Sequence, residues 1–68
     1  MRPMSAEMVE SFLKKNGFRL VSSKGSHFKW ENQATGKWTI VPHHGNRLIQ
    51  QGMLNAIFSQ AGIPKPQR

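Results

Sequence analysis

The sequence predicts an α+β fold of order αβββα, a three-stranded antiparallel sheet with two helices on one face. Three observations support this prediction. Apolar residues recur at spacings of three and four near both ends of the chain, which is typical of one-sided helices. The middle of the chain alternates apolar and polar residues in short runs, as in strands that bury one face. Glycine, serine, asparagine and proline separate these runs, as expected for turns and loops.

The first helix is predicted from Ser5 to Asn16. Ser5 is a suitable N-cap, and Glu7 stands in the first turn, where the helix dipole favours negative charge. Gly17 provides the left-handed residue that often ends a helix. Residues 1–4 are expected to form a disordered lead. The stripe that this helix buries is predicted to contain Met8, Val9, Phe12 and Leu13.

Three strands are predicted over residues 18–22, 27–31 and 37–41, with a turn at 23–26 and a loop at 32–36. The first strand alternates imperfectly. In the third strand Trp38 and Ile40 are assigned to the buried side, and Thr39 and Lys37 to the solvent side. Pro42 is expected to end this strand. Both helices should therefore cover a face that contains Phe28, Trp30, Trp38 and Ile40.

The second helix is predicted from about Gln50 to Ala61, with Gly62 as its stop and Ile63 packed behind it. Whether it begins before or after Gly52 is left open. A polar loop at 43–47 precedes it, and residues 65–68 are expected to fray. The chain is expected to form a single domain, residues 1–68, with a small core. The predicted core residues are Phe12, Leu13, Phe28, Trp30, Trp38, Ile40, Leu54, Ile57 and Phe58.

The charge balance points to a polyanionic partner. Ten lysines and arginines stand against three glutamates, which gives a net charge of +7 in 68 residues. The absence of cysteine excludes disulfides and thiolate metal sites. No apolar run approaches the ~20 residues of a membrane span, and no signal-peptide pattern opens the chain. We therefore expect a cytoplasmic protein that binds nucleic acid or an acidic protein and needs no membrane, metal or cofactor.

The candidate site is centred on His27, which follows the Gly25-Ser26 turn on the expected solvent face of the sheet. Histidine exchanges protons near neutral pH, since its reference pKa is about 6.5. RNA carries its own nucleophile, the 2′-hydroxyl, so a base together with cations that stabilise the transition state is sufficient for its cleavage. The expected catalytic residue is His27, and the expected RNA- or phosphate-binding residues are Lys24, Ser26, Lys29, Lys37 and His44.

Other chemistries are less consistent with the sequence. A metal site formed by the three histidines, at positions 27, 43 and 44, fits no known spacing. Ser26 as a nucleophile lacks a carboxylate to orient the histidine. A base-stacking platform of the tryptophans and Phe28 is disfavoured, because the alternation places these rings under the helices. The general acid remains open between His44, a lysine and protonated His27.

Several segments occur together in a known order. They are Asn16-Gly17-Phe18, Gly25-Ser26-His27, Val41-Pro42-x-His44, and Gly52 leading into Ile57-x-x-Gln60-Ala61-Gly62-Ile63. In this set the chain resembles the HicA toxins of bacterial and archaeal toxin–antitoxin pairs, which are small mRNA interferases with a double-stranded-RNA-binding-domain-like fold. The resemblance covers almost the whole chain. One departure is Phe28, where many relatives have a second histidine.

The resemblance implies that His27 corresponds to the family's catalytic histidine and that His44, not His43, corresponds to its Pro-x-His histidine. It also implies RNA cleavage and a HicB-type antitoxin that covers the active face. The leading hypothesis is thus a metal-independent endoribonuclease toxin. The alternatives are a non-catalytic RNA-binding module with a basic open face, and a small interaction domain for an acidic protein.

Overall fold

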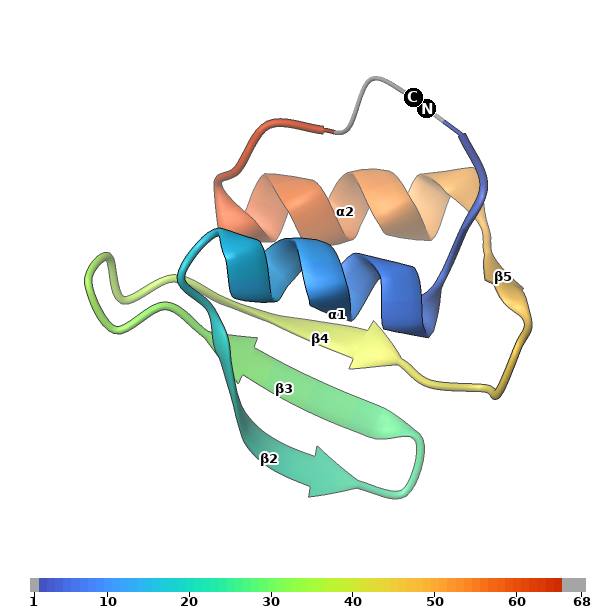
Figure 1. Ribbon diagram of the computed structural model, residues 1–68, viewed down its shortest axis with the longest axis horizontal. Coiled ribbons are helices and arrows are strands. Elements are labelled where there is room, and N and C mark those ends of the chain that lie inside the picture. The colour runs from blue at the N-terminus through green and yellow to red at the C-terminus, as the bar shows by residue number, and fades with distance from the viewer. Residues whose placement is uncertain (1, 66–68) are drawn as a thin grey trace.

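The computed structural model describes residues 2–65 and has the predicted helix–sheet–helix order (Figure 1). The main sheet is antiparallel with strand order β2-β3-β4, and the two helices are α1 and α2. Two short strands, β1 and β5, pair with each other in a separate antiparallel ribbon that was not predicted. The bounds are β1 Met4–Ser5, α1 Ala6–Lys15, β2 Arg19–Lys24, β3 His27–Glu31, β4 Trp38–Pro42, β5 Leu48–Ile49 and α2 Gln51–Ala61.

Both helices begin and end close to the predicted residues. The Ser5 side chain caps α1 by accepting a hydrogen bond from the Met8 backbone N–H at 3.4 Å. Gly62 ends α2 in the left-handed conformation, with φ of 69°. The open question at Gly52 is answered, because α2 begins at Gln51. Met8 was wrongly placed in the buried stripe, since its side chain is exposed while Ala6, Val9 and Leu13 are buried.

The predicted disordered lead is wrong for Met4. This residue pairs with Ile49 in the β1–β5 ribbon, and its side chain is buried. Two-residue strands are too short to give a periodic signal, which is why the sequence did not reveal them. Met1 and residues 66–68, for which disorder and fraying were predicted, lie outside the described residues.

Strand β2 is longer than predicted, because Ser23 and Lys24 continue the pairing up to a turn at Gly25-Ser26. The register shifts between Leu20 and Ser22, which marks a β-bulge. A bulge adds one residue to one strand and interrupts its alternation. The imperfect pattern of this strand in the sequence is therefore a consequence of the bulge.

The predicted faces of β4 are wrong. Trp38 and Ile40 are 45% and 38% exposed, whereas Thr39 and Val41 are completely buried. Thr39 satisfies its hydroxyl by donating to the Gln60 side-chain oxygen on α2, at 3.0 Å. The physical reason is the register, since Trp30 pairs with Thr39 and Phe28 pairs with Val41. Directly opposed residues share a face, so the buried Trp30 brings Thr39 inward with it.

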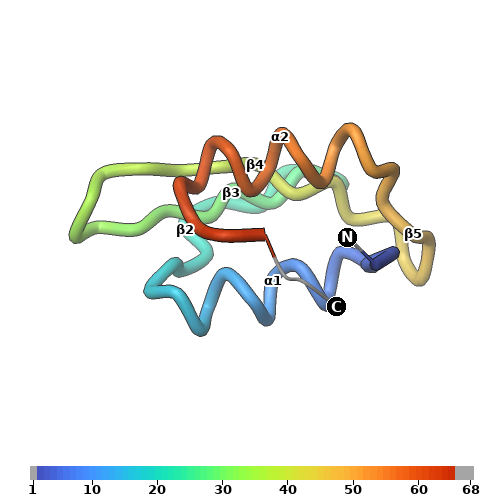
Figure 2. The backbone as a smooth tube through the Cα atoms, turned by 90° about the horizontal axis from the view of Figure 1, so that it is seen from above, coloured from blue at the N-terminus to red at the C-terminus, as the bar shows by residue number. Residues whose placement is uncertain are grey.

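The core lies between α1, α2 and the inner face of the sheet. Phe12 of α1 and Phe58 of α2 meet edge to face, with ring centroids 5.5 Å apart. Figure 2 shows α1 standing off one face of the sheet and α2 running close to β4. The other face, which carries Trp38 and Ile40, is left exposed. The buried apolar residues are Met4, Ala6, Val9, Leu13, Phe18, Trp30, Val41, Leu54, Ile57, Phe58 and Ala61, with Phe12, Phe28, Ile49 and Ile63 packed against them.

Candidate functional site

The uncovered side of the sheet, which we call the open face, is organised in three cross-strand rows. Residues that pair directly across antiparallel strands point to the same side, so the register determines which side chains share a row. The sequence predicts that Arg19, His27, Lys29 and Lys37 share this face. The register is consistent with this prediction for Arg19, His27 and Lys29 but not for Lys37, whose side chain lies against Gly62. From one end of the sheet to the other, the rows are Arg19–Glu31–Trp38, Ser22–Lys29–Ile40 and Lys24–His27–Pro42.

His27 lies at one end of the open face. It is the first residue of β3, directly after Gly25-Ser26, and its side chain is exposed. Gly25 has φ of 59°, a conformation that glycine adopts without strain and that makes this tight turn possible. Lys24 is the direct cross-strand partner of His27. Within residues 2–65 the His27 ring has no hydrogen bond or ion pair, so it is available to a ligand.

The chain returns to this turn after β4. The His43 backbone N–H donates to the Ser26 carbonyl oxygen at 2.7 Å, which holds the loop after β4 beside the Gly25-Ser26 turn. The His43 ring turns inward, where it stacks on Phe28 with a centroid distance of 4.7 Å. Its Nε2 atom lies 3.4 Å from Glu10 Oε1. His43 is therefore part of the packing between the sheet and α1.

Glu10 of α1 contacts β3 and the loop after β4 through its two carboxylate oxygens. Oε1 faces His43, and Oε2 accepts a hydrogen bond from Trp30 Nε1 at 3.0 Å. This carboxylate is committed to contacts that support the fold. Of the other acidic residues, Glu7 lies in the first turn of α1 and Glu31 at the far end of β3 from His27. The His27 end of the open face therefore keeps its positive charge.

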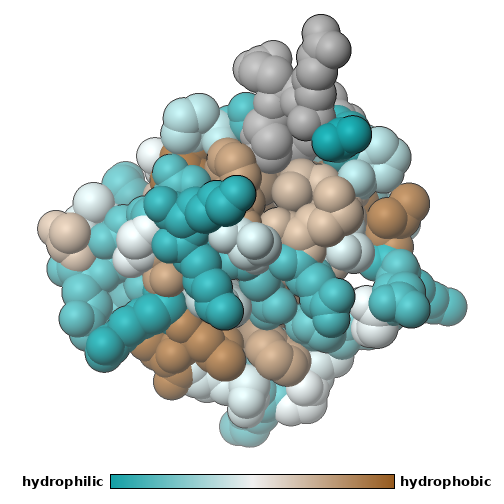
Figure 3. All heavy atoms as spheres, viewed as in Figure 1, coloured by the Kyte–Doolittle hydropathy of each residue, from teal (hydrophilic) through white to brown (hydrophobic). Residues whose placement is uncertain are grey.

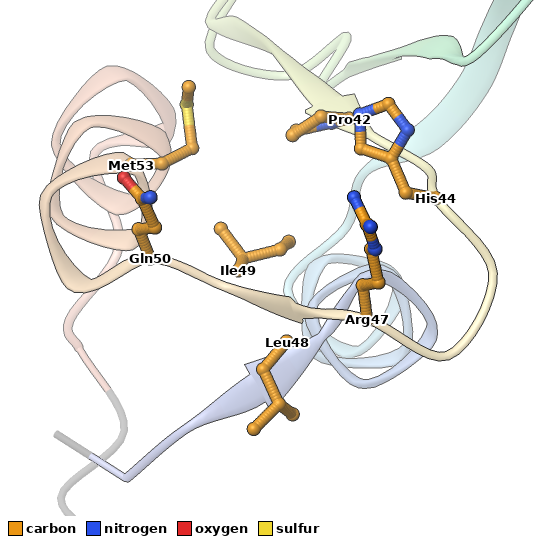
Figure 4. Close-up of a pocket in the computed structure, with 7 residues that line it drawn as sticks. All are labelled: Pro42, His44, Arg47, Leu48, Ile49, Gln50 and Met53. Carbon is orange, nitrogen blue, oxygen red and sulfur yellow. The ribbon is translucent and has the colours of Figure 1, made fainter.

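His44 points away from the core and lines a surface hollow of about 260 Å³ (Figure 4). The Arg47 side chain extends along this hollow toward Pro42 and His44. Helix α2 begins at the same hollow, and Gln50 at its N-cap makes no side-chain capping bond. The positive end of the helix dipole adds to the charge of Arg47 here. A phosphate group would be stabilised by each of these features.

The remaining predicted lysines lie in different places. Lys29 is central on the open face, and its Nζ atom stands 4.6 Å from the centroid of the Trp38 ring, a cation–π contact. Lys37 precedes β4, whereas His27 pairs with Pro42 at the other end of that strand, so the two residues lie at opposite ends of the sheet. Its side chain lies against Gly62 after α2. The structure thus brings Lys24, Ser26 and His44 to the His27 end of the sheet, and Lys37 does not join them.

Comparison with protein families decides where this chain belongs. Residues 6–63, which include all the predicted site residues, match the family described as HicA toxin of bacterial toxin–antitoxin. The chain belongs to the HicA toxin family. It is also similar to the probable mRNA interferase HicA of Pseudomonas fluorescens (strain Pf0-1), with 36% identity over 52 residues, which is 76% of this chain and 83% of the relative. No solved structure gives a significant match.

Membership of the HicA family makes the difference between the adjacent histidines informative. The resemblance noted in the sequence implies that the family's Pro-x-His histidine corresponds to His44, and in this structure His44 is exposed while His43 is held by Phe28 and Glu10. Within residues 2–65 no three side chains of His, Asp or Glu are placed to hold a metal ion. In the same part of the chain, no helix has the length and apolar character needed to cross a membrane.

Two residues that this fold brings to the candidate site, Arg47 and Trp38, are not among the site residues predicted from the sequence. Arg47 was assigned only to a polar loop, yet it lines the hollow beside His44. The available signal was its place between the Pro-x-His segment and the second helix, where the first turn of a helix favours anions. Trp38 was assigned to the core, yet it lies on the open face. No sequence signal would have shown this, because both sides of its strand carry apolar residues.

Proposed function

We propose that this HicA-family toxin is a metal-independent endoribonuclease that cleaves mRNA, with His27 as its general base. The observation that carries the proposal is the exposed His27 directly opposite Lys24, at the edge of a basic face and beside the His44–Arg47 hollow. The relative from Pseudomonas fluorescens is described as a probable mRNA interferase, which supports the same reaction. An extended RNA strand can lie along an open sheet face, with its phosphates beside the basic side chains.

In the proposed reaction, neutral His27 removes the proton of an RNA 2′-hydroxyl. The 2′-oxygen attacks the adjacent phosphorus, the bond from phosphorus to the 5′-oxygen breaks, and the leaving oxygen takes up a proton. The products are a 2′,3′-cyclic phosphate and a 5′-hydroxyl. Removal of the proton by a positioned base contributes about 10²- to 10⁴-fold to such reactions.

The proposed cations act on the phosphate. Lys24 and Lys29 flank His27 on the open face, one in the same row and one in the next, and they offset the charge that builds up on the phosphoryl oxygens. Ser26 offers a hydroxyl at the turn. We assign His44 to phosphate binding in the hollow, together with Arg47. Lys37 lies about 17 Å from His27 along the strand direction, so it contacts a different nucleotide.

A toxin of a toxin–antitoxin pair needs an antitoxin, and we propose a HicB-type protein that covers the open face. An acidic antitoxin surface would be attracted to a chain of net charge +7. Such a partner would prevent RNA binding and would thereby inhibit the toxin. Since mRNA is the proposed substrate, the cytoplasm is the proposed place of action.

The test is incubation of the purified protein with a mixed RNA in excess chelator, followed by end-group analysis. We expect cleavage that the chelator does not prevent, with 2′,3′-cyclic phosphate and 5′-hydroxyl ends. An oligonucleotide with a single 2′-deoxy nucleotide at a mapped cleavage site should resist cutting at that site only. RNA binding without cleavage would instead support the non-catalytic RNA-binding module.

A further inference from the structure

The open face carries a large aromatic ring, that of Trp38, which is partly exposed to solvent. Trp38 is 45% exposed and is flanked in the next row by Ile40, which is 38% exposed. Trp30, on the neighbouring strand, is buried and pairs its Nε1 with Glu10. The same residue type thus has a structural position on one side of the sheet and an exposed position on the other.

We propose that Trp38 is a stacking platform for an unpaired base of the RNA, with Lys29 as the cation that binds the adjoining phosphate. This inference rests on the proposed function and specifies which conformation of RNA the open face binds. Proteins that bind single-stranded RNA on a sheet place aromatic rings under the bases and basic side chains along the backbone. The open face has both parts in contact, since Lys29 Nζ lies 4.6 Å from the Trp38 ring centroid.

The charges around Trp38 favour RNA over an apolar protein surface. The rows of the open face contain three cations, Arg19, Lys24 and Lys29, and one acid, Glu31. Arg19 is the direct cross-strand neighbour of Glu31, so the two charges in this row sum to zero. The exposed large apolar side chains in these rows are those of Trp38 and Ile40, and Val21, which is 40% exposed, lies at the bulge of β2. A ring with cations beside it matches a base with its phosphates.

The position of Trp38 relative to His27 fits one continuous strand of RNA. Trp38 of β4 pairs with Glu31, the last residue of β3, and His27 is the first residue of β3. Trp38 and His27 are therefore separated by four residues along the strand direction and by one strand across the sheet. At about 3.4 Å per residue and 4.8 Å per strand, this separation is roughly 14 Å. A single RNA strand covers that distance with a few nucleotides, and Lys29 lies between Trp38 and His27. The stacked base therefore belongs to a nucleotide near the cleaved bond, and not to one of the two nucleotides that this bond joins.

Lys29 has two partners in this proposal. In the free protein its ammonium group lies over the indole, which partly covers the ring. An incoming base competes for that side of the ring, and the long, flexible lysine side chain can turn to the phosphate instead. A cation–π contact at an exposed site is worth little compared with a charge-assisted bond to phosphate, so the exchange favours the complex.

The experiment measures RNA affinity in a His27→Ala background, where the RNA stays intact. Trp38→Leu removes the aromatic face and keeps an apolar side chain, and Trp38→Phe keeps a smaller aromatic face. Leu20→Ala is the matched control, because Leu20 is 44% exposed on the same sheet but pairs with Trp30 on the other face. Circular dichroism and a urea titration establish that each variant is folded.

We expect Trp38→Leu to weaken binding of single-stranded RNA by about 5- to 150-fold, the range observed when an aromatic platform is lost. Trp38→Phe should recover most of the affinity, and Leu20→Ala should match the background protein. An abasic nucleotide at the stacked position should lower the RNA affinity of the background protein and leave the RNA affinity of Trp38→Leu unchanged. This coupling is a readout that a merely structural role would not produce.

The inference is overturned if folded Trp38→Leu binds RNA like the background protein while the parent still cleaves RNA. It is also overturned if Trp38→Leu keeps its RNA affinity but loses affinity for the antitoxin, which would make this face a protein-docking surface. Failure of the proposed function has a different signature. In that case the parent does not cleave RNA, whatever residue stands at position 38.

Discussion

Replacing each tryptophan by alanine should give very different losses of stability. Trp30 is 4% exposed and its Nε1 donates to Glu10, whereas Trp38 is 45% exposed and its ring faces solvent beside Lys29. Trp30→Ala removes a buried ring, leaves a cavity and takes the donor from a partly buried carboxylate. The expected cost is about 3–5 kcal/mol. A chain of this length has a total stability of roughly 3–10 kcal/mol, so this variant should be largely unfolded.

Trp38→Ala should cost much less, about 1–2 kcal/mol. Roughly half of the ring is already in water, so less apolar area is lost, and the vacated space opens to solvent without forming a cavity. The assay is urea unfolding followed by circular dichroism, with the slope of the transition compared between variants. Equal destabilisation by the two substitutions, or a greater loss for Trp38→Ala, would refute the assignment of the two faces. A prediction based on the sequence alone would have given both residues the same large loss.

Three further results are expected. RNA affinity should fall about 20- to 50-fold between about 50 and 200 mM salt if three or four phosphates are contacted, and an affinity that barely responds to salt would contradict backbone binding. Gly62→Ala should destabilise by about 1–2 kcal/mol in thermal or urea unfolding, because φ is 69° and the new Cβ would lie 2.7 Å from Lys37 Cδ; a neutral result would show that the helix end can relax. The cleavage rate should decrease as the pH is lowered from about 7 to about 5, since a general base must be unprotonated, and a rate that rises toward acid pH would exclude this role for a histidine.

The helices were predictable from the sequence because their ends carry strong local signals. Ser5, Gly17 and Gly62 act through caps and left-handed residues, which depend on a few neighbouring residues only. The three main strands were located for a similar reason. The β1–β5 ribbon was not, since a two-residue strand is defined by its partner and has no pattern of its own.

The faces of β4 were not predictable by alternation. Residues 38–41 contain three apolar side chains and one threonine, so either side of the strand can serve as the buried one. The choice depends on the loop between β3 and β4. The Asn32 backbone N–H donates to the Lys37 carbonyl oxygen at 2.9 Å, and Gly36 N–H donates to the Asn32 carbonyl oxygen at 2.8 Å. These bonds belong to the register that places Thr39 opposite Trp30.

The candidate site was predicted in part. Alternation places Arg19, His27, Lys29 and Lys37 on an exposed basic face, and the register supports this for the first three. Lys37 does not join them, because its side chain lies against Gly62. The distinction between His43 and His44 came from the resemblance to HicA toxins. The structure adds its physical reason, which is the contact of His43 with Phe28 and Glu10. Such long-range contacts leave no mark in the local sequence.

The central claim, that His27 is the general base, is tested most directly by the cleavage rate of His27→Ala. The substitution is on an exposed side chain, so the variant should fold and should still bind RNA. His43→Gln serves as a control for a histidine that we place in the packing, and it should change stability more than cleavage by the folded protein. We predict that folded His27→Ala retains RNA affinity and loses about 10²- to 10⁴-fold in single-turnover cleavage rate. A folded His27→Ala protein that cuts RNA at the parent rate would contradict the account.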